Sequence, residues 1–143
     1  MANLNHGYKY GDRVPVMLPV DSSTTAIAVG DMLTIATAGY YKKWTTGAVV
    51  YGVAMQQLDT ADLPASDGLV SVLADVSPLS VYTYALSAGT LVVGMRGKTC
   101  DAGGAQLIDV TASTNDDLHI VDVDTTNQVA LVRPLIPSLG GVV

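Results

Sequence analysis

The chain of 143 residues carries a formal net charge of −6, and only 14% of its residues are charged whereas 49% are hydrophobic. This composition is too apolar for a disordered chain, and no apolar run reaches the roughly 18 residues of a spanning helix. The seven Lys and Arg residues are scattered. We therefore expect neither nucleic acid nor a membrane as a partner.

The residue types predict an all-β fold. All thirteen acidic residues are Asp, which favours turns, and Glu, which favours helices, is absent. Val and Thr are abundant, as is typical of strands, and 14 Gly residues supply turns. We expect a small β-sandwich, or a β-barrel or tulip-like domain, that spans residues 14–137.

Residues 1–13 have no apolar periodicity and predict an extended N-terminal arm. Aromatic and Arg side chains are enriched at protein interfaces, and the arm carries several candidates: Tyr8, Lys9, Tyr10 and Arg13. The next run, Val14–Val20, contains Pro15 and Pro19, which restrict it to an edge strand or an extended segment.

A Gly30-Asp31 turn signal precedes a predicted strand from Met32 to Thr37, and residues 40–45 form the return strand. This return strand concentrates aromatic and basic residues. Lys42 and Trp44 are therefore further candidates for contact with a neighbouring subunit.

Residues 48–55 read as a buried strand, in which Gly52 suggests a close backbone approach. A long loop follows at residues 56–67, with one helical turn possible at 60–63; loops of this length are often functional.

The second half of the chain alternates between short apolar runs and turn residues. We expect a turn at residues 101–104, where Asp101 and two glycines occur, and an apolar tail at 138–143. The predicted strands are residues 68–76, 79–86, 90–95, 106–112, 118–123 and 128–133.

Catalytic groupings are missing from the pattern. His6, His119 and Cys100 are isolated, so no zinc site is expected, and Cys100 reads as a small buried apolar residue. The oxygen-rich segment 122–127 lacks the central Gly and terminal Glu of an EF-hand loop, and turn chemistry accounts for it. We therefore predict a protein that is not an enzyme and that needs no cofactor or metal.

Several short segments in this order resemble the capsid decoration, or cement, proteins of tailed bacteriophages. They are Gly30-Asp31-Met32-Leu33, the run Val49 to Met55, the strand Val70 to Val76, the run Ser87 to Val92 and the closing run Val129 to Arg133. In that family a "GD(L/M)" turn and a "VGVA" strand recur; here Tyr51 interrupts the second motif.

The resemblance implies a structural protein that binds the major capsid protein on the outer surface of the phage head. Members of the family commonly act as homotrimers at three-fold positions, and assembly takes place in the host cytoplasm. The alternative is a β-rich tail or fibre module that binds a cell-surface glycan through exposed aromatic side chains.

Overall fold

The computed structural model describes residues 7–137, and this part of the chain is an all-β protein, as the composition predicts. The predicted tail at 138–143 and the first six residues of the arm lie outside the described residues. The strands are β1 (Gly7–Tyr10), β2 (Pro15–Pro19), β3 (Met32–Ile35), β4 (Tyr41–Lys43), β5 (Gly52–Ala54), β6 (Ser71–Asp75), β7 (Val81–Ala88), β8 (Thr99–Gly104), β9 (Leu107–Asp109), β10 (Leu118–Asp124) and β11 (Val129–Pro134). Two single turns of 3₁₀-helix, η2 (Thr60–Asp62) and η3 (Val93–Met95), interrupt the loops.

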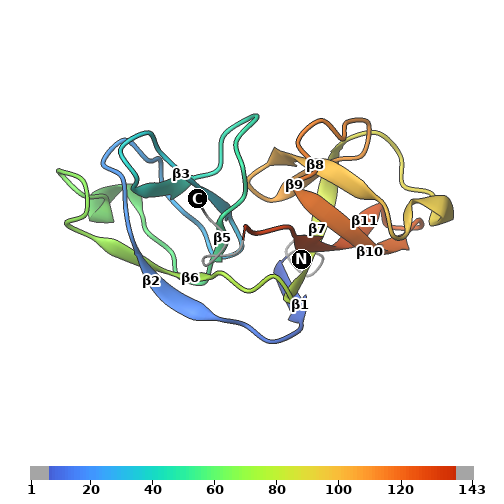
Figure 1. Ribbon diagram of the computed structural model, residues 1–143, viewed down its shortest axis with the longest axis horizontal. Helices are drawn as coiled ribbons and strands as arrows, with labels where there is room; N and C mark the ends of the chain where they lie inside the picture. The colour runs from blue at the N-terminus through green and yellow to red at the C-terminus, as the bar shows by residue number, and fades with distance from the viewer. Residues whose placement is uncertain (1–6, 138–143) are drawn as a thin grey trace.

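The strands form two sheets that make two lobes along the long axis of the molecule (Figure 1). The first sheet has the order β1-β7-β11-β10-β8-β9, so it contains β1 and every strand from β7 onward. Its β7 and β9 also pair with each other in parallel, so β7, β11, β10, β8 and β9 close into a ring. This lobe is therefore a small barrel, which removes the free edges of those five strands.

The second sheet has the order β2-β6-β5-β3-β4, so it contains the strands from β2 to β6. A parallel bridge between Val20 and Tyr41 joins its two outer strands, and the Asp21 N–H donates to the Tyr41 carbonyl at 2.8 Å. The first sheet therefore contains a closed ring, and the second is curved so far that a single bridge joins its two outer edges.

Two apolar clusters fill the molecule. One lies within the second sheet and includes Leu18, Ile27, Leu33 and Val72. The other joins side chains from both sheets: Met32, Trp44, Val50, Val53, Tyr82, Tyr84, Leu91, Cys100, Ala102, Ile108, Leu118, Ile120, Ala130 and Val132. Because this second cluster crosses the boundary between the lobes, the lobes pack on each other through apolar burial.

The Gly30-Asp31 turn also joins the lobes through polar contacts. The buried Asp31 carboxylate accepts hydrogen bonds from the Ala28 N–H at 2.8 Å and the Gln106 side-chain amide at 2.9 Å, and the Lys43 Nζ lies 3.4 Å away. The Tyr84 hydroxyl donates to the Gly30 carbonyl at 2.8 Å. Because Gln106 and Tyr84 belong to the other half of the chain, the turn acts as a clamp between the sheets.

A second polar contact between the lobes centres on Asp75 at the end of β6. Its Oδ1 accepts hydrogen bonds from the backbone N–H groups of Val14 and Ser77, each at 2.9 Å, and its Oδ2 accepts from the Tyr82 hydroxyl at 2.6 Å. Asp75 and Tyr82 are both buried. A buried carboxylate held by three donors fixes the start of β2 and the start of β7 relative to each other.

Three predicted elements differ from the structure. Of the predicted buried strand 48–55, only Gly52–Ala54 pairs, as β5, and Val49 is 43% exposed. Residues 90–95 do not form a strand. The Gln128 side chain holds the Leu91 backbone, Val92 and Val93 are exposed, and the last three residues, Val93–Met95, form η3. Residues 101–104 are not a turn but part of β8. A Cβ at Gly103 would overlap the Ser87 hydroxyl, so the glycine permits a close approach of strands at the point where the ring closes.

Candidate binding surface

The described part of the predicted arm contains β1, which is added to the edge of the barrel lobe. Gly7 pairs with Thr83, Tyr8 with Tyr82 and Tyr10 with Val81, with a bulge between Tyr8 and Tyr10. Gly11 then turns the chain at φ +104° against the backbone of Leu79, where a Cβ would overlap the Leu79 carbonyl oxygen. Residues 7–11 therefore lie along β7 of their own chain.

Exposed apolar and aromatic side chains gather around β1, and we call this group the arm patch. Its members are Tyr8 (38% exposed), Tyr10 (49%), Val14 (47%) and Leu79 (57%), together with the exposed Lys9 and Arg13. Tyr and Arg are the residue types that most often anchor protein interfaces. The structure brings four of the predicted site residues together here.

The arm patch is connected to the core by stacked side chains. The Arg13 guanidinium carbon lies 3.6 Å from the Tyr8 ring centroid, in cation–π geometry. Tyr8 meets Tyr82 edge to face at 5.8 Å between centroids, and Tyr82 stacks on Tyr84 at 6.0 Å with their planes 6° apart. Because Tyr82 and Tyr84 are buried, this ladder orients the exposed Tyr8 and Arg13 before any partner binds.

The strand edges differ in how they are protected. At the two ends of β2, the Val14 carbonyl accepts a hydrogen bond from the Val76 N–H and the Val20 N–H donates to the Val70 carbonyl. The backbone N–H and C=O groups of the even-numbered residues therefore point toward β6. The backbone groups of the odd-numbered residues point to the outer edge, where Pro15 and Pro19 have no N–H to donate to a further strand. Within residues 7–137, β1 pairs only with β7 and contains no proline, so its outer edge lacks this protection.

Lys42 and Trp44 lie away from the arm patch, in and directly after β4. Trp44 is only 6% exposed, packs in the shared core cluster and donates its indole N–H to the Ala48 carbonyl at 2.8 Å. The prediction that Trp44 contacts a neighbouring subunit is therefore corrected, because its side chain packs inside the core of its own chain. Lys42 is half-buried on β4.

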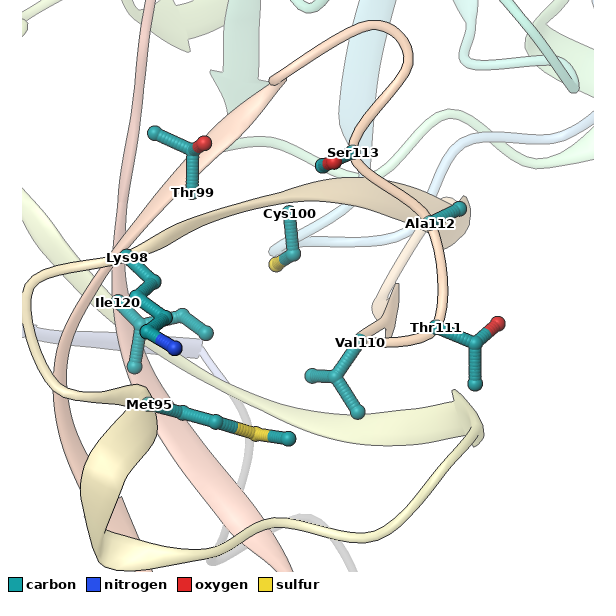
Figure 2. Close-up of a pocket in the computed structure, with 9 residues that line it drawn as sticks. All are labelled: Met95, Lys98, Thr99, Cys100, Val110, Thr111, Ala112, Ser113 and Ile120. Carbon is teal, nitrogen blue, oxygen red and sulfur yellow. The ribbon is translucent and has the colours of Figure 1, made fainter.

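A hollow of about 240 Å³ opens at the barrel lobe, between η3, β8 and the segment after β9. Figure 2 shows the Cys100 thiol, the Met95 thioether and the Val110 side chain directed into it, with Lys98 alongside. Cys100 is buried, as the sequence predicts. Burial, together with the nearby Asp101 carboxylate, raises the pKa of the Cys100 thiol to about 12, so the thiol stays protonated and is a poor nucleophile.

The polar residues that the sequence analysis considered as possible metal ligands form hydrogen bonds or ion pairs with nearby residues of the chain. The Asp124 carboxylate caps its own turn by accepting from the Thr126 and Asn127 N–H groups at 3.0 Å, and Asp122 pairs with Arg96 at 2.6 Å. His119 lies 3.2 Å from the Arg133 guanidinium. In the described ranges, no three His, Cys or Asp side chains come together in a way that could hold a metal ion.

No family model, curated protein or solved structure matches this chain. Over residues 7–137, no helix is long and apolar enough to cross a bilayer. The arm patch is the surface on which the functional interpretation depends.

Proposed function

We propose that this chain is a structural decoration protein that binds the outer surface of a phage head, contacts the major capsid protein and acts as a homotrimer without catalysis. The observation that supports this most strongly is the arm patch: aromatic, aliphatic and Arg side chains exposed beside an unprotected strand edge. These are the components of a protein-binding surface.

The energetics of a cement protein suit such a surface. A decoration protein stabilises a shell by bridging subunits, so each contact can be weak if several are linked on one oligomer. Linked contacts gain effective concentration, and avidity rises by about 10² to 10⁴ over a single contact. The nearly closed sheets supply a rigid body, and the stacked Tyr8 and Arg13 are oriented in advance.

The family-like segments have structural roles in this fold. The Gly30-Asp31 turn holds the two sheets together through hydrogen bonds. Gly52, in the run Val49 to Met55, lies close to β6, where a Cβ would stand 3.3 Å from the Asp75 carbonyl oxygen. The segments that carry the resemblance therefore help to hold the two sheets together. The decoration role itself rests on that resemblance and on the arm patch together.

The glycan-binding alternative is weaker. Sugar recognition by stacking needs exposed aromatic faces, whereas Trp44, Tyr82 and Tyr84 are buried in the shared core. Their positions leave Tyr8 and Tyr10 of the arm patch as the best-exposed aromatic side chains in residues 7–137.

Co-sedimentation with expanded empty heads tests the proposal. We expect saturable binding by the wild type and at least tenfold weaker binding by the double variant Lys9→Ser/Tyr10→Ser. The matched control is Lys98→Ser/Val93→Ser, which removes an exposed Lys and an exposed apolar side chain at η3 and should bind normally. Wild-type protein that never sediments with heads would refute the proposal.

A further inference from the structure

The hollow in the barrel lobe is a cavity that the proposed function does not use. None of the residues that line it belongs to the arm patch. Its volume of about 240 Å³ exceeds the roughly 150 Å³ of a cavity that holds benzene. By the same ratio of volume to atoms, the hollow can hold an organic molecule of about eight to ten non-hydrogen atoms.

The inner surface of the hollow is apolar. Figure 2 shows Met95 of η3, Val110 after β9 and Ile120 of β10 directed into one space, with the Cys100 thiol of β8. Cys100 and Ile120 are buried, whereas Met95 and Val110 are half-buried, so the hollow runs from the surface to the core. Because a methionine side chain adapts to the shape of its neighbours, Met95 suits a wall that a small molecule contacts.

One charged side chain lines this apolar space. Among the described residues around the hollow, Lys98 alone is charged, and it is exposed. Neither of the two ion pairs within residues 7–137 involves it. Figure 2 shows its ammonium group turned toward the hollow. The hydroxyls of Thr99 and Thr111, by contrast, donate to Asp116 and Asp109 of the chain itself.

The wider surroundings of the hollow are negative. Burial and, after it, four nearby carboxylates raise the pKa of the Cys100 thiol; they belong to Asp101, Asp117, Asp109 and Asp116. These carboxylates oppose the attraction of Lys98 for an anion that has no apolar part. A molecule that binds here therefore needs apolar burial for most of its affinity, and a negative group beside Lys98 for its orientation.

We infer that the hollow binds a small carboxylate whose apolar body has about five to seven carbon atoms. The body packs on Met95, Val110 and Ile120, and the carboxylate pairs with the Lys98 ammonium where the hollow opens to solvent. This site is independent of the decoration role, because it shares no residue with the arm patch.

Titration of the full chain with three matched probes at pH 7 tests the inference. Hexanoate has both parts, hexan-1-ol has the apolar body without the charge, and acetate has the charge without the body. The readout is the NMR signals of the Met and Ile methyl groups, because Met95 and Ile120 line the hollow. We expect hexanoate to shift both signals saturably with a dissociation constant of about 1 mM, which a ligand of this size can reach. Acetate should cause no saturable shift.

Two variants separate the contribution of the charge from that of the cavity. Lys98→Met should bind hexanoate about threefold to fivefold more weakly, as expected for an exposed ion pair, and should bind hexan-1-ol as the wild type does. The matched control Lys42→Met removes a lysine from the other sheet and should leave both affinities unchanged. Val110→Phe places a larger side chain in the hollow and should abolish binding of both probes. Circular dichroism confirms folding, and Met95→Phe replaces Val110→Phe if that variant does not fold.

Three results would overturn the inference. The first is a wild type whose Met95 and Ile120 signals do not shift saturably with hexanoate. The second is a Lys98→Met variant that binds hexanoate as tightly as the wild type. The third is a folded variant with a filled hollow that still binds both probes. Binding to heads is measured separately, and its absence would leave this inference intact.

Discussion

Two stacked tyrosines allow a matched test of the contacts that hold the lobes together. Tyr82 and Tyr84 lie on β7, both are buried, and each hydroxyl donates one hydrogen bond across the boundary between the sheets. The Tyr82 hydroxyl donates to the Asp75 carboxylate at 2.6 Å, whereas the Tyr84 hydroxyl donates to the neutral Gly30 carbonyl at 2.8 Å. Replacing either by Phe removes one hydroxyl and keeps the ring.

The magnitudes follow from the acceptors. A hydrogen bond to a charged group contributes about 1.5–3 kcal/mol, and a neutral one about 1 kcal/mol. A protein of this size loses about 4 °C in Tm for each kcal/mol. We therefore expect Tyr82→Phe to lower the Tm by about 8 °C and Tyr84→Phe by about 4 °C.

Burial raises the pKa of both tyrosine hydroxyls far above the usual range, so both remain donors throughout the neutral and mildly alkaline range. The assay is thermal unfolding of the two variants at pH 7.5, followed by circular dichroism, with urea unfolding as an independent measure of the free energy. If Tyr84→Phe destabilises the protein as much as or more than Tyr82→Phe, the hydrogen bond from Tyr82 to Asp75 does not stabilise the fold more than the one from Tyr84 to Gly30. That result would refute the reasoning.

Three further predictions concern single residues. In urea unfolding, Gly11→Ala should lower the free energy of unfolding more than the control Gly47→Ala. Both glycines have positive φ, but only at Gly11 would a Cβ overlap backbone atoms. Equal losses of free energy would contradict this. Cys100 should react with a thiol reagent at pH 8 only after denaturation, because it is buried and its pKa is raised to about 12; rapid labelling of the folded protein would refute this. Burial raises the pKa of the Asp117 carboxyl above 3.8, so the folded state binds this proton more tightly than the unfolded state. The tighter proton binding stabilises the folded state at low pH, and that stabilisation is lost as pH rises through the folded pKa. The stability of Asp117→Asn relative to the wild type, from urea unfolding at pH 3.5 and pH 7, should therefore increase with pH, and a difference that does not change would contradict the assignment.

The all-β fold and most strands could be predicted from the sequence because alternation and turn residues are local signals. Pro15 and Pro19 correctly indicated an edge, and Cys100 was correctly expected to be buried. Local signals failed where glycine had a tertiary role: Gly103 lies in β8 because the ring must close tightly there. The apolar run that includes Val92 and Val93 predicts a strand, although both side chains are exposed.

The candidate surface was only partly visible in the sequence. Tyr8, Tyr10 and Arg13 can be selected by residue type. Leu79 lies near them because Gly11 turns against its backbone just before β7, a tertiary contact that no local pattern encodes. Residue type selects Trp44 for the same reason as the tyrosines, but its burial depends on how the segment after β4 packs against the core. The sequence does not reveal that the Asp31 and Asp75 carboxylates link the two sheets by hydrogen bonds. An Asp after Gly or at the end of a strand is equally well explained as a turn residue.

Cryo-electron microscopy of heads incubated with the purified protein tests the central proposal most directly. We predict added density on the outer surface at the three-fold positions, into which three copies of the two-lobed chain fit, with β1 at a contact with the capsid or a neighbouring copy. Heads that stay bare at saturating protein, or density confined to the tail, would contradict the proposed function.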